Sequence, residues 1–469
     1  ELSSLSDVAE FVYDDAAFSD YLEGKLSHDD VIEVAGFLFR ERKNFRRLIG
    51  LRYPFIFVDE AQDTFIPIVE GLNKTCERAG LPMVGYFGDP WQQIYEGRAG
   101  EFAPPNGGKE ITKVENFRCS PEVIDLLNAF RTDVRQVPAG SNAEVAGSVG
   151  IHLVQAEAPE APRKRYTEEQ LDRALTKMDQ VVDAWGWADR GDVIRLFLVR
   201  QMIARRLKFP TIHQIFTGPY ASQRAQDDYE AGEHYLLKPF IATICPLVEA
   251  SEKGDNRAVI DILRSQSPAY DPRGLNAERK LKAMIKQSKD HLSELAKIWA
   301  AGTAKDALAY CSESGLIKAS DKLVHHLNRS PRKDEYDDET HSDEKGDWLA
   351  DNFFSMSTNE LSAYRDFILE NTPYSTQHGV KGEEYTNVMV VFDDVEASWN
   401  QYSFTKLLAP GVAGNPTEGQ HERGRKLAYV CFSRAEQNLR ILFFTPNPSE
   451  TKKELLAKGL FRENQIAME

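Results

Sequence analysis

The chain has 469 residues and a formal net charge of −16 at pH 7, so it is long enough for roughly two to four domains with a sizeable core. Its acidic balance argues against a protein that coats nucleic acid non-specifically, because phosphate binding depends on local positive charge; a narrow basic channel stays compatible with it. We find no apolar run long enough to span a bilayer and no signal-like amino terminus. We therefore expect a soluble protein with no membrane partner.

Cysteine usage indicates the compartment. The five cysteines are scattered along the chain without paired spacing: Cys76, Cys119, Cys245, Cys311 and Cys431. This pattern indicates neither a disulfide framework nor a zinc knuckle. We expect a cytoplasmic protein whose thiols stay reduced.

Residues 1–51 are predicted to be mostly helical and to lead into a first strand. The stretch LSHDDVIEVAGFLFRERKNFRRLIG has an apolar stripe at helical spacing and begins with Ser-x-Asp-Asp, which is typical of a helix start. The next stretch, PFIFVDEAQDTF, opens with an apolar, β-prone run at residues 55–58. We predict that this run is a strand buried on both faces in a parallel sheet.

Three acids follow this strand. Asp59 and Glu60 come directly after it, and Asp63 comes three residues after Glu60. Open α/β sheets bind ligands at the carboxyl ends of their strands, where a carboxylate can hold a Mg²⁺ bound to nucleotide phosphates. The alternative is structural: Asp59 or Asp63 caps a helix over residues 64–78.

The rest of the chain is predicted to alternate between α/β and helical parts. Buried strands are expected at PMVGYFGDP and GDVIRLFLVR, with a helix after FRCS and a solvated linker at QAEAPEAPRKRY between them. From about residue 210 to 370 the pattern indicates helices, with the charged run SPRKDEYDDETHSDEKGD as a solvated loop. Because strand pattern returns at TNVMVVFDD and NLRILFF, we interpret the helical block as an insertion.

Two clusters in the first half of the chain suit nucleotide chemistry. GDPWQQIYEGRAG places Gln92 just after the second strand, where an amide can orient a water or sense a terminal phosphate. In ENFRCSPEV, Phe117 can stack on a base and Arg118 can grip a phosphate. Taken singly, these are also a polar turn and a core Phe beside a surface Arg.

Two further clusters lie near the carboxyl end. STQHGVKGEEYTNVMVV carries His378, Lys381 and Glu384 in a glycine-containing loop before a strand. RKLAYVCFSRAEQNLRILFF carries Arg434 toward the last strand, where an Arg from a second domain can act as an arginine finger. Taken singly, His378 is also a plain loop histidine and Arg434 a surface charge.

In series, the motifs VDEAQD, GDPWQQIY, NFRCS, TQHGVKGEE and YVCFSRA resemble those of superfamily 1 helicases of the UvrD, Rep and PcrA type, over nearly the whole chain. The resemblance implies an α/β fold of the P-loop NTPase type, in which two RecA-like parallel-sheet domains bind a nucleotide between them and carry helical insertions. It implies five segments: 1–50, the helical tail of a first insertion; 51–116, the remainder of the first RecA-like domain; 117–209, the first part of the second; 210–370, a helical insertion; and 371–469, the last part of the second.

The resemblance also implies roles. ATP and Mg²⁺ are the expected cofactors. Asp59 and Glu60 are expected at the metal, and Glu60 is also expected to polarise the attacking water. Gln92, Arg118 and Arg434 are expected to contact the γ-phosphate and complete the catalytic set. The nucleotide would be bound by Phe117, Arg118, Gly382, Glu384 and Arg434, with Phe117 standing where the family usually has Tyr. Single-stranded DNA would meet Tyr95, Arg98, Thr376 and His378.

The sequence departs from the family pattern at two places. We find no phosphate loop of the form GxxxxGK[ST], since EGKLS and GGKEI lack its first glycine and its hydroxyl. Because the chain begins at Glu1 rather than Met, we expect a missing upstream segment and a chain that hydrolyses ATP poorly by itself; a chain that truly starts here would be a degenerate or two-component motor. Gly97 stands where many relatives have a Trp that stacks on a base.

These observations predict an ATP-dependent DNA helicase or translocase that moves on single-stranded DNA, 3′ to 5′ as its relatives do, in repair, recombination or anti-phage defence. Its partners would be single-stranded or partly duplex DNA and a nuclease or other protein. The compact second insertion and HGVKGEEYTNVMVVFDD are also similar to the helicase partners of nucleases in anti-phage systems such as Gabija. The alternatives are a non-catalytic DNA-binding or scaffold subunit that keeps the fold, and a metal nuclease using Asp59, Glu60 and Asp63.

Overall fold

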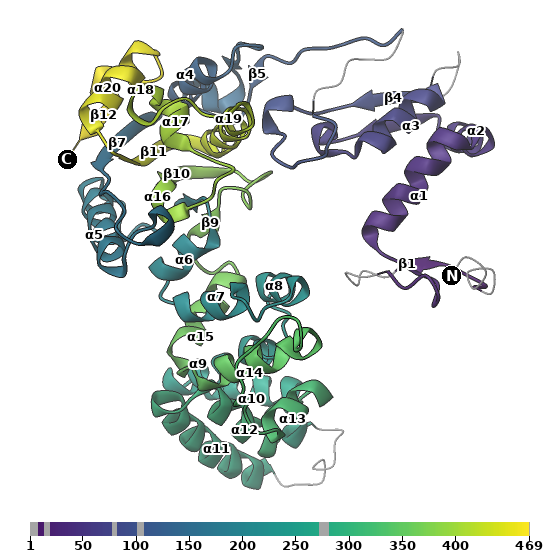
Figure 1. The fold of residues 1–469 in the computed structure, drawn as a ribbon, viewed down its shortest axis with the longest axis vertical. Coiled ribbons are helices and arrows are strands. Elements are labelled where there is room, and N and C mark those ends of the chain that lie inside the picture. Colours follow the sequence, from purple (N-terminus) through teal and green to yellow (C-terminus); the bar gives the residue numbers. More distant parts are fainter. Residues whose placement is uncertain (1–7, 14–18, 77–81, 101–106, 272–280, 469) are drawn as a thin grey trace. The chain divides into compact units, whose positions relative to one another are not determined.

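The computed structural model describes residues 8–13, 19–76, 82–100, 107–271 and 281–468. The chain divides into two compact units, one formed by Glu1–Leu198 with Ser375–Glu469 and one formed by Val199–Tyr374. Figure 1 shows the elements of each unit along the chain. Within the described residues, none of the helices combines the length and the apolar character that crossing a membrane would need.

The first described residues form two short strands followed by helices. β1 (Val12–Tyr13) pairs in parallel with β2 (Lys25–Leu26), so this part is less helical than predicted. The predicted helix start is confirmed, because Ser27 and Asp30 form a capping box at the beginning of α1 (His28–Glu41). α2 (Lys43–Arg52) and α3 (Ile66–Cys76) follow. Part of the predicted helical tail, residues 1–7 and 14–18, lies outside the described residues.

The strand before the acids is present, but its predicted burial is wrong. Among the described residues, β3 (Phe55–Val58) pairs in parallel with β4 (Met83–Tyr86) alone, in a two-stranded sheet. Phe55 and Phe57 are 63% and 62% exposed, and Met83 is 53% exposed. α3 packs on β4, where the Tyr86 hydroxyl donates to Asn73 Oδ1 at 2.8 Å. Phe55 and Phe57 stay exposed because, among the described residues, this sheet has two strands rather than the predicted buried core.

A six-stranded sheet forms the centre of the first unit. Its order is β12–β7–β11–β10–β8–β9, and the pairs β12·β7, β7·β11, β11·β10 and β10·β8 are parallel. The strands are β7 (Ser148–Gln155), β8 (Val193–Phe197), β9 (Tyr374–Thr376), β10 (Tyr385–Phe392), β11 (Ala435–Thr445) and β12 (Ile466–Met468). The predictions at β8, β10 and β11 are confirmed, whereas β7, within SVGIHLVQ, was missed. Strands that precede and follow the helical unit thus share one sheet.

Helices surround this sheet. They are α4 (Pro121–Phe130), α5 (Glu168–Ala184), α16 (Asp394–Ala397), α17 (Phe404–Leu408), α18 (Pro410–Ala413), α19 (Glu418–Phe432) and α20 (Pro448–Ala457). α4 packs on β7 and β11, and α19 packs on β10 and β11. A short parallel pair, β5 (Glu115–Asn116) with β6 (Val137–Pro138), lies on the chain before and after α4. The first unit is therefore a mixed α/β structure with parallel sheets.

The second unit is helical. It contains α6 (Arg200–Arg206), α7 (Pro210–Thr217), α8 (Gln223–Glu230), a π-helical turn (Phe240–Ile244), α9 (Cys245–Glu252), α10 (Asn256–Gln266), α11 (Leu281–Ala301), α12 (Ala304–Glu313), α13 (Asp321–Asn328), α14 (Lys345–Ser355) and α15 (Leu361–Ile368). The helical prediction for residues 210–370 is confirmed for the described part. Its core is aromatic: the Tyr229 ring stacks between Phe216 at 5.3 Å and Tyr364 at 5.2 Å.

Candidate functional site

The acids after β3 lie on a strained turn. Glu60 is a non-glycine residue in the left-handed region, with φ 47° and ψ 43°, a conformation that costs on the order of 1 kcal/mol or more. The turn is held by hydrogen bonds: the Glu60 amide donates to Asp59 Oδ1 at 2.9 Å, and Gln62 Nε2 donates to Glu60 Oε2 at 2.6 Å. Asp59 and Glu60 are both exposed. The turn therefore presents two carboxylates at the carboxyl end of the strand, as predicted from the sequence.

Asp63 is paired with a lysine from the distant loop. Lys381 Nζ donates to Asp63 Oδ2 and lies 3.9 Å from Glu60 Oε2. Burial lowers the pKa of Lys381 to about 8, although the charge of Glu60 acts in the opposite direction. The other carboxylate oxygen, Asp63 Oδ1, is buried without a hydrogen-bond partner among the described residues. The sequence placed Lys381 in the loop but gave it no role, so its contact with the acid turn is a new observation.

Gln92 and Arg434 meet although they are 342 residues apart, as Arg434 Nη2 donates to Gln92 Oε1 at 3.4 Å. Gln92 ends a short 3-10 turn (Pro90–Gln92), which Asp89 caps by accepting from the Trp91 amide at 3.1 Å. Arg434 is fully buried, and its other nitrogens donate to backbone oxygens of Glu383 and Val430 at 2.9 and 3.0 Å. Burial, followed by the charge of Arg118, lowers the pKa of Arg434.

A pocket of about 340 Å³ brings together three of the predicted nucleotide-binding residues. It is lined by Lys113, Val114, Glu115, Asn116, Phe117, Arg118, Gln136 and Glu384. Arg118 Nε and Glu384 Oε1 are 2.7 Å apart, and Phe117 is 61% exposed. Gly382 has a positive φ of 90° in the same loop as Glu384, a conformation that glycine adopts without strain. The volume lies within the range of small-molecule sites, and an exposed ring beside a guanidinium suits a base with an attached phosphate.

Tyr95 and Arg98 lie on the loop after Gln92. The Tyr95 ring is 44% exposed, and its centroid is 5.5 Å from Lys381 Nζ. The Arg98 guanidinium lies 3.4 Å above the Phe65 ring, and its Nη1 is buried without a hydrogen-bond partner among the described residues. Tyr95 is therefore available for stacking, while Arg98 is packed against an aromatic ring. Their predicted contact with DNA stays a prediction.

Thr376 and His378 lie beside an aromatic cluster. Thr376 Oγ1 accepts from the Gly379 amide at 3.0 Å. His378 Nε2 lies 2.9 Å from the Tyr402 hydroxyl, and its ring centroid is 5.6 Å from that of Trp399. Burial lowers the pKa of His378 to about 4. The imidazole is therefore neutral near pH 7, so it can donate one hydrogen bond and accept another but brings no charge to a phosphate.

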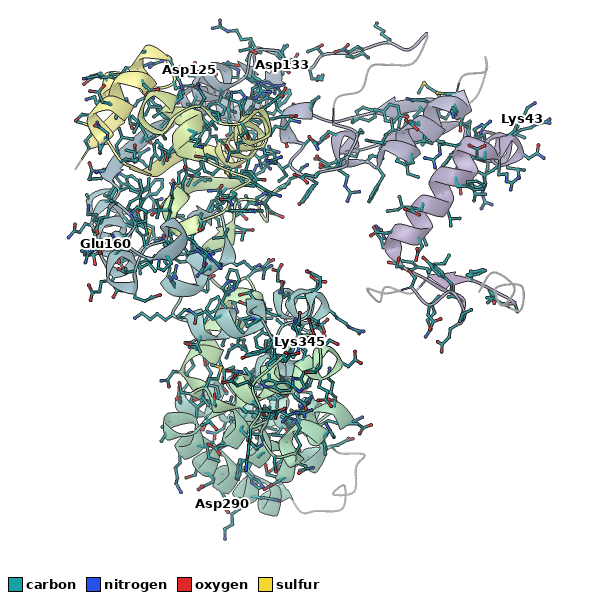
Figure 2. All side chains as sticks on the ribbon, in the orientation of Figure 1. Lys43, Asp125, Asp133, Glu160, Asp290 and Lys345 are labelled. Carbon is teal, nitrogen blue, oxygen red and sulfur yellow. The ribbon has the colours of Figure 1, made fainter. Side chains whose placement is uncertain are left out.

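A buried arginine behind Gln92 was missed by the sequence analysis. Arg131 donates to Asp89 Oδ2 at 3.0 Å, to Asp133 Oδ2 at 2.8 Å and to the Tyr429 hydroxyl at 2.8 Å; Asp133 is labelled in Figure 2. Burial acts to lower the pKa of Arg131. The hydrogen bond to Asp133 and the charges of Tyr429 and Asp89 outweigh this effect, so the pKa of Arg131 is raised. The cluster joins the turn that ends in Gln92 to α19, which precedes Arg434. No local sequence signal marks it, because its members come from separate segments.

The carboxylates do not form a multi-ligand metal site. Among the described residues, no group of three or more His, Cys, Asp and Glu is arranged to hold a metal ion. Asp63 is paired with Lys381, which removes it from the set that a nuclease would need. This arrangement gives no support to the nuclease alternative, since two-metal sites require converging carboxylates. A Mg²⁺ held mainly by nucleotide phosphates needs only one or two protein carboxylates, and the exposed Asp59 and Glu60 fit that requirement.

Comparison with known proteins gives one informative match. No family model matches the chain. The chain is similar to the Gabija protein GajB of Bacillus cereus (strain HuB5-5), with 24% identity over 447 residues, covering 89% of this chain and 62% of that protein. The chain thus spans less than two thirds of the length of the curated relative it matches. It has weak homology to GajB.

Proposed function

We propose that this chain acts in an ATP-driven DNA helicase or translocase of superfamily 1. The observation that carries the proposal is the hydrogen bond between Arg434 and Gln92. Both residues were chosen from sequence motifs for a γ-phosphate, and they are 342 residues apart in the chain. A guanidinium and an amide at one point can neutralise and sense charge that develops on a transferred phosphoryl group.

The residues present fit a nucleotide with Mg²⁺. Phe117 offers an exposed ring for the adenine, and Arg118 and Glu384 line the same pocket. Asp59 would hold the metal, and Glu60 would orient the attacking water from its strained turn. Bound ATP would supply the phosphoryl transfer whose free energy drives movement. Opening and closing of the protein around the nucleotide would then move a strand held by Tyr95, Arg98, Thr376 and the loop of His378.

The pathway is proposed from similarity. Resemblance to the helicase partners of nucleases in anti-phage systems, together with the similarity to the Gabija protein GajB, favours anti-phage defence over general repair. A nuclease is accordingly the proposed protein partner, and the cytoplasm is the proposed location. Movement from 3′ to 5′ follows the behaviour of the resembled family.

A second candidate is a non-catalytic DNA-binding or scaffold subunit. Its supporting observation is that these 469 residues contain no GxxxxGK[ST] loop. The preserved set Asp59, Glu60, Arg118 and Arg434 favours the motor, because a scaffold has no need of buried charge such as that of Arg434, which is costly to maintain.

The test is ATP hydrolysis by the full-length protein in the presence of single-stranded DNA. Glu60→Gln should reduce the turnover rate by about 100-fold or more, since activation of the water is removed, while binding of a fluorescent ATP analogue should change by less than about threefold. Glu70→Gln is the matched control, because Glu70 is an exposed carboxylate on α3. This variant should leave the turnover rate and the binding of the ATP analogue unchanged. Turnover that survives Glu60→Gln would contradict the role of Glu60, and a wild-type protein without DNA-stimulated turnover would favour the scaffold.

A further inference from the structure

Trp399 is an exposed ring that no motif or relative assigns to a function. It lies in the loop between α16 and α17, and 36% of its surface is exposed. Its ring centroid is 4.8 Å from that of Tyr402 and 5.6 Å from that of His378. We propose that Trp399 is a base-stacking residue for single-stranded DNA, held in place by Tyr402 and His378. This inference rests on the proposed function and adds to it a residue outside the predicted DNA-contact set.

A series of aromatic contacts connects Trp399 to the core of the sheet. Phe392, the last residue of β10, stacks on Phe404 with ring centroids 3.9 Å apart. Phe404 in turn stacks on Tyr402 at 6.3 Å and 19°. Phe392, Phe404 and Tyr402 are all buried, so Trp399 is the exposed end of a rigid aromatic series. A ring that buried neighbours already hold in one orientation loses little conformational entropy when a flat ligand stacks on it.

The loop that carries Trp399 is fixed at both ends. Ser398, just before it, has a positive φ of 47°, and the Tyr402 amide donates to the Trp399 carbonyl at 3.1 Å. Asp394 accepts from the amides of Phe404 and Thr405 at 2.9 and 2.8 Å. A non-glycine residue at positive φ is tolerated where the surroundings determine the conformation. The loop is thus built to present Trp399 in one orientation.

The same loop is tied to α19. Gln420 Nε2 donates to the Asn400 carbonyl at 2.8 Å, and Arg423 Nε donates to the Gln401 carbonyl at 3.3 Å. Arg423 also lies 3.5 Å from Glu96, with both side chains partly exposed. Glu96 belongs to the segment that carries Tyr95 and Arg98. Trp399 therefore lies on a loop connected to the segments predicted to face DNA. The Arg423 guanidinium is hydrogen-bonded to Gln401, which lies two residues after Trp399 in the chain.

The surroundings favour a nucleic-acid base over an apolar protein surface. The exposed neighbours of Trp399 in the loop are Ser398, Asn400 and Gln401, so the chain on both sides of the ring is polar. Protein hot spots lie inside larger packed apolar patches, whereas a base needs only one flat ring and nearby polar or cationic groups. A Trp here also provides the kind of ring that Gly97 lacks.

His378 has a positioning role in this scheme. Its Nε2 is 2.9 Å from the Tyr402 hydroxyl, so the imidazole fixes the ring on which Trp399 packs. A neutral, half-buried imidazole is suited to this role, whereas the exposed Trp399 makes the contact with the strand. Tyr402→Phe, which removes only the hydroxyl, would separate positioning from stacking.

The experiment measures binding of the full-length protein to single-stranded oligodeoxythymidylate and to a strand of equal length made of abasic sites. Trp399→Ala should weaken binding to the thymidylate strand by about 5- to 150-fold, the equivalent of one lost stacked base, whereas Trp399→Phe should lose less than about fivefold. On the abasic strand, wild type and Trp399→Ala should bind equally. Tyr53→Ala, which removes another exposed ring, is the control and should match wild type on both strands.

Each outcome discriminates. Equal weakening of Trp399→Ala on both strands would overturn stacking and indicate a general loss of structure, which circular dichroism of Trp399→Ala would reveal. Unchanged binding on both strands, with wild type binding well, would overturn the inference and leave the proposed function intact; it would point to a protein partner at Trp399. A wild-type protein that binds neither strand would overturn the proposed function itself.

Discussion

His378 shows how the surroundings of a side chain decide what it can do. The sequence predicted contact with DNA because the residue lies in the motif TQHGVKGEE. In the structure its imidazole is desolvated and lies next to the Tyr402 hydroxyl, and burial lowers its pKa from 6.5 to about 4. A histidine that stays neutral through the physiological range cannot gain affinity for a phosphate by protonation. Its contribution is therefore one of shape and hydrogen bonding.

The depressed pKa of His378 makes stability dependent on pH. As the pH falls below 6.5, the unfolded chain binds a proton that the folded chain does not accept until about pH 4. Stability is therefore unaffected above pH 6.5 and is lost progressively between pH 6.5 and 4. His378→Gln should remove about 1–2 kcal/mol of this loss near pH 5, measured as the difference in urea unfolding of the first unit between pH 7 and 5.

The buried His213 and His234, whose pKa values burial lowers to about 4 and about 3, lie in the second unit and are unchanged in the variant. They serve as an internal reference, since the pH dependence of that unit should stay the same. An identical pH dependence of the first unit in wild type and His378→Gln would show that His378 is solvated in solution.

Residue types and their order were enough to select Gln92, Arg434, Phe117, Arg118 and Glu384, which the structure brings together as one pair and one pocket. They were not enough to find Lys381, Arg131 or Trp399 as members of a site. Each of these depends on a contact between segments far apart in the chain, which no periodicity encodes. The roles of all these residues stay predictions.

Elements show the same division between local and distant causes. β8, β10 and β11 were predicted because each contains a mostly apolar stretch, VIRLF in β8, VMVVF in β10 and ILFF in β11, and the residues of these stretches are mostly buried. β3 is also apolar, but within the part of the chain that the structure describes it pairs only with β4, and Phe55 and Phe57 stay exposed. The apolar composition of a segment predicts that it forms a strand. It does not predict how many strands pair with that segment, because this number depends on parts of the chain that are far apart in sequence.

The junction of the Gln92 turn with α4 and α19 depends on one buried cation. Arg131→Met removes the partner of Asp89 and leaves that carboxylate partly buried, with the side chain of Asp89 only 22% exposed. Breaking a buried pair costs about 3 kcal/mol or more. Hydrogen exchange should therefore show a comparable fall in the opening free energy of α4 and α19, without loss of the six-stranded sheet.

The matched control is Arg462→Met. Arg462 pairs with Asp125 at 2.8 Å, but both side chains are mostly exposed, at 71% and 64%, and Asp125 is labelled in Figure 2. An exposed ion pair contributes about 0–1 kcal/mol, so this variant should match wild type. If both variants lost the same small amount, Arg131 would be no more than a surface charge in solution.

At the scale of the whole molecule, each of the two units has a core of its own among the described residues. The helical unit has its own cluster of buried residues between Ala204 and Tyr364, including Phe216, Phe240 and Phe353. The first unit has the buried residues of its six-stranded sheet, such as Leu442 of β11. Since hydrophobic stabilisation comes from area buried within each core, each unit has its own source of stability.

Two separate cores predict two unfolding steps. Phe353→Ala should cost the helical unit about 3–5 kcal/mol, and Leu442→Ala should cost the first unit about 2–5 kcal/mol, because each leaves a cavity in a fully buried site. Hydrogen exchange should show faster opening only within Val199–Tyr374 in the first variant, and only in β7, β10 and β11 in the second. Each variant is the control for the other. If either substitution speeded exchange equally in both units, the chain would unfold as one cooperative body, and the two-step prediction would be wrong.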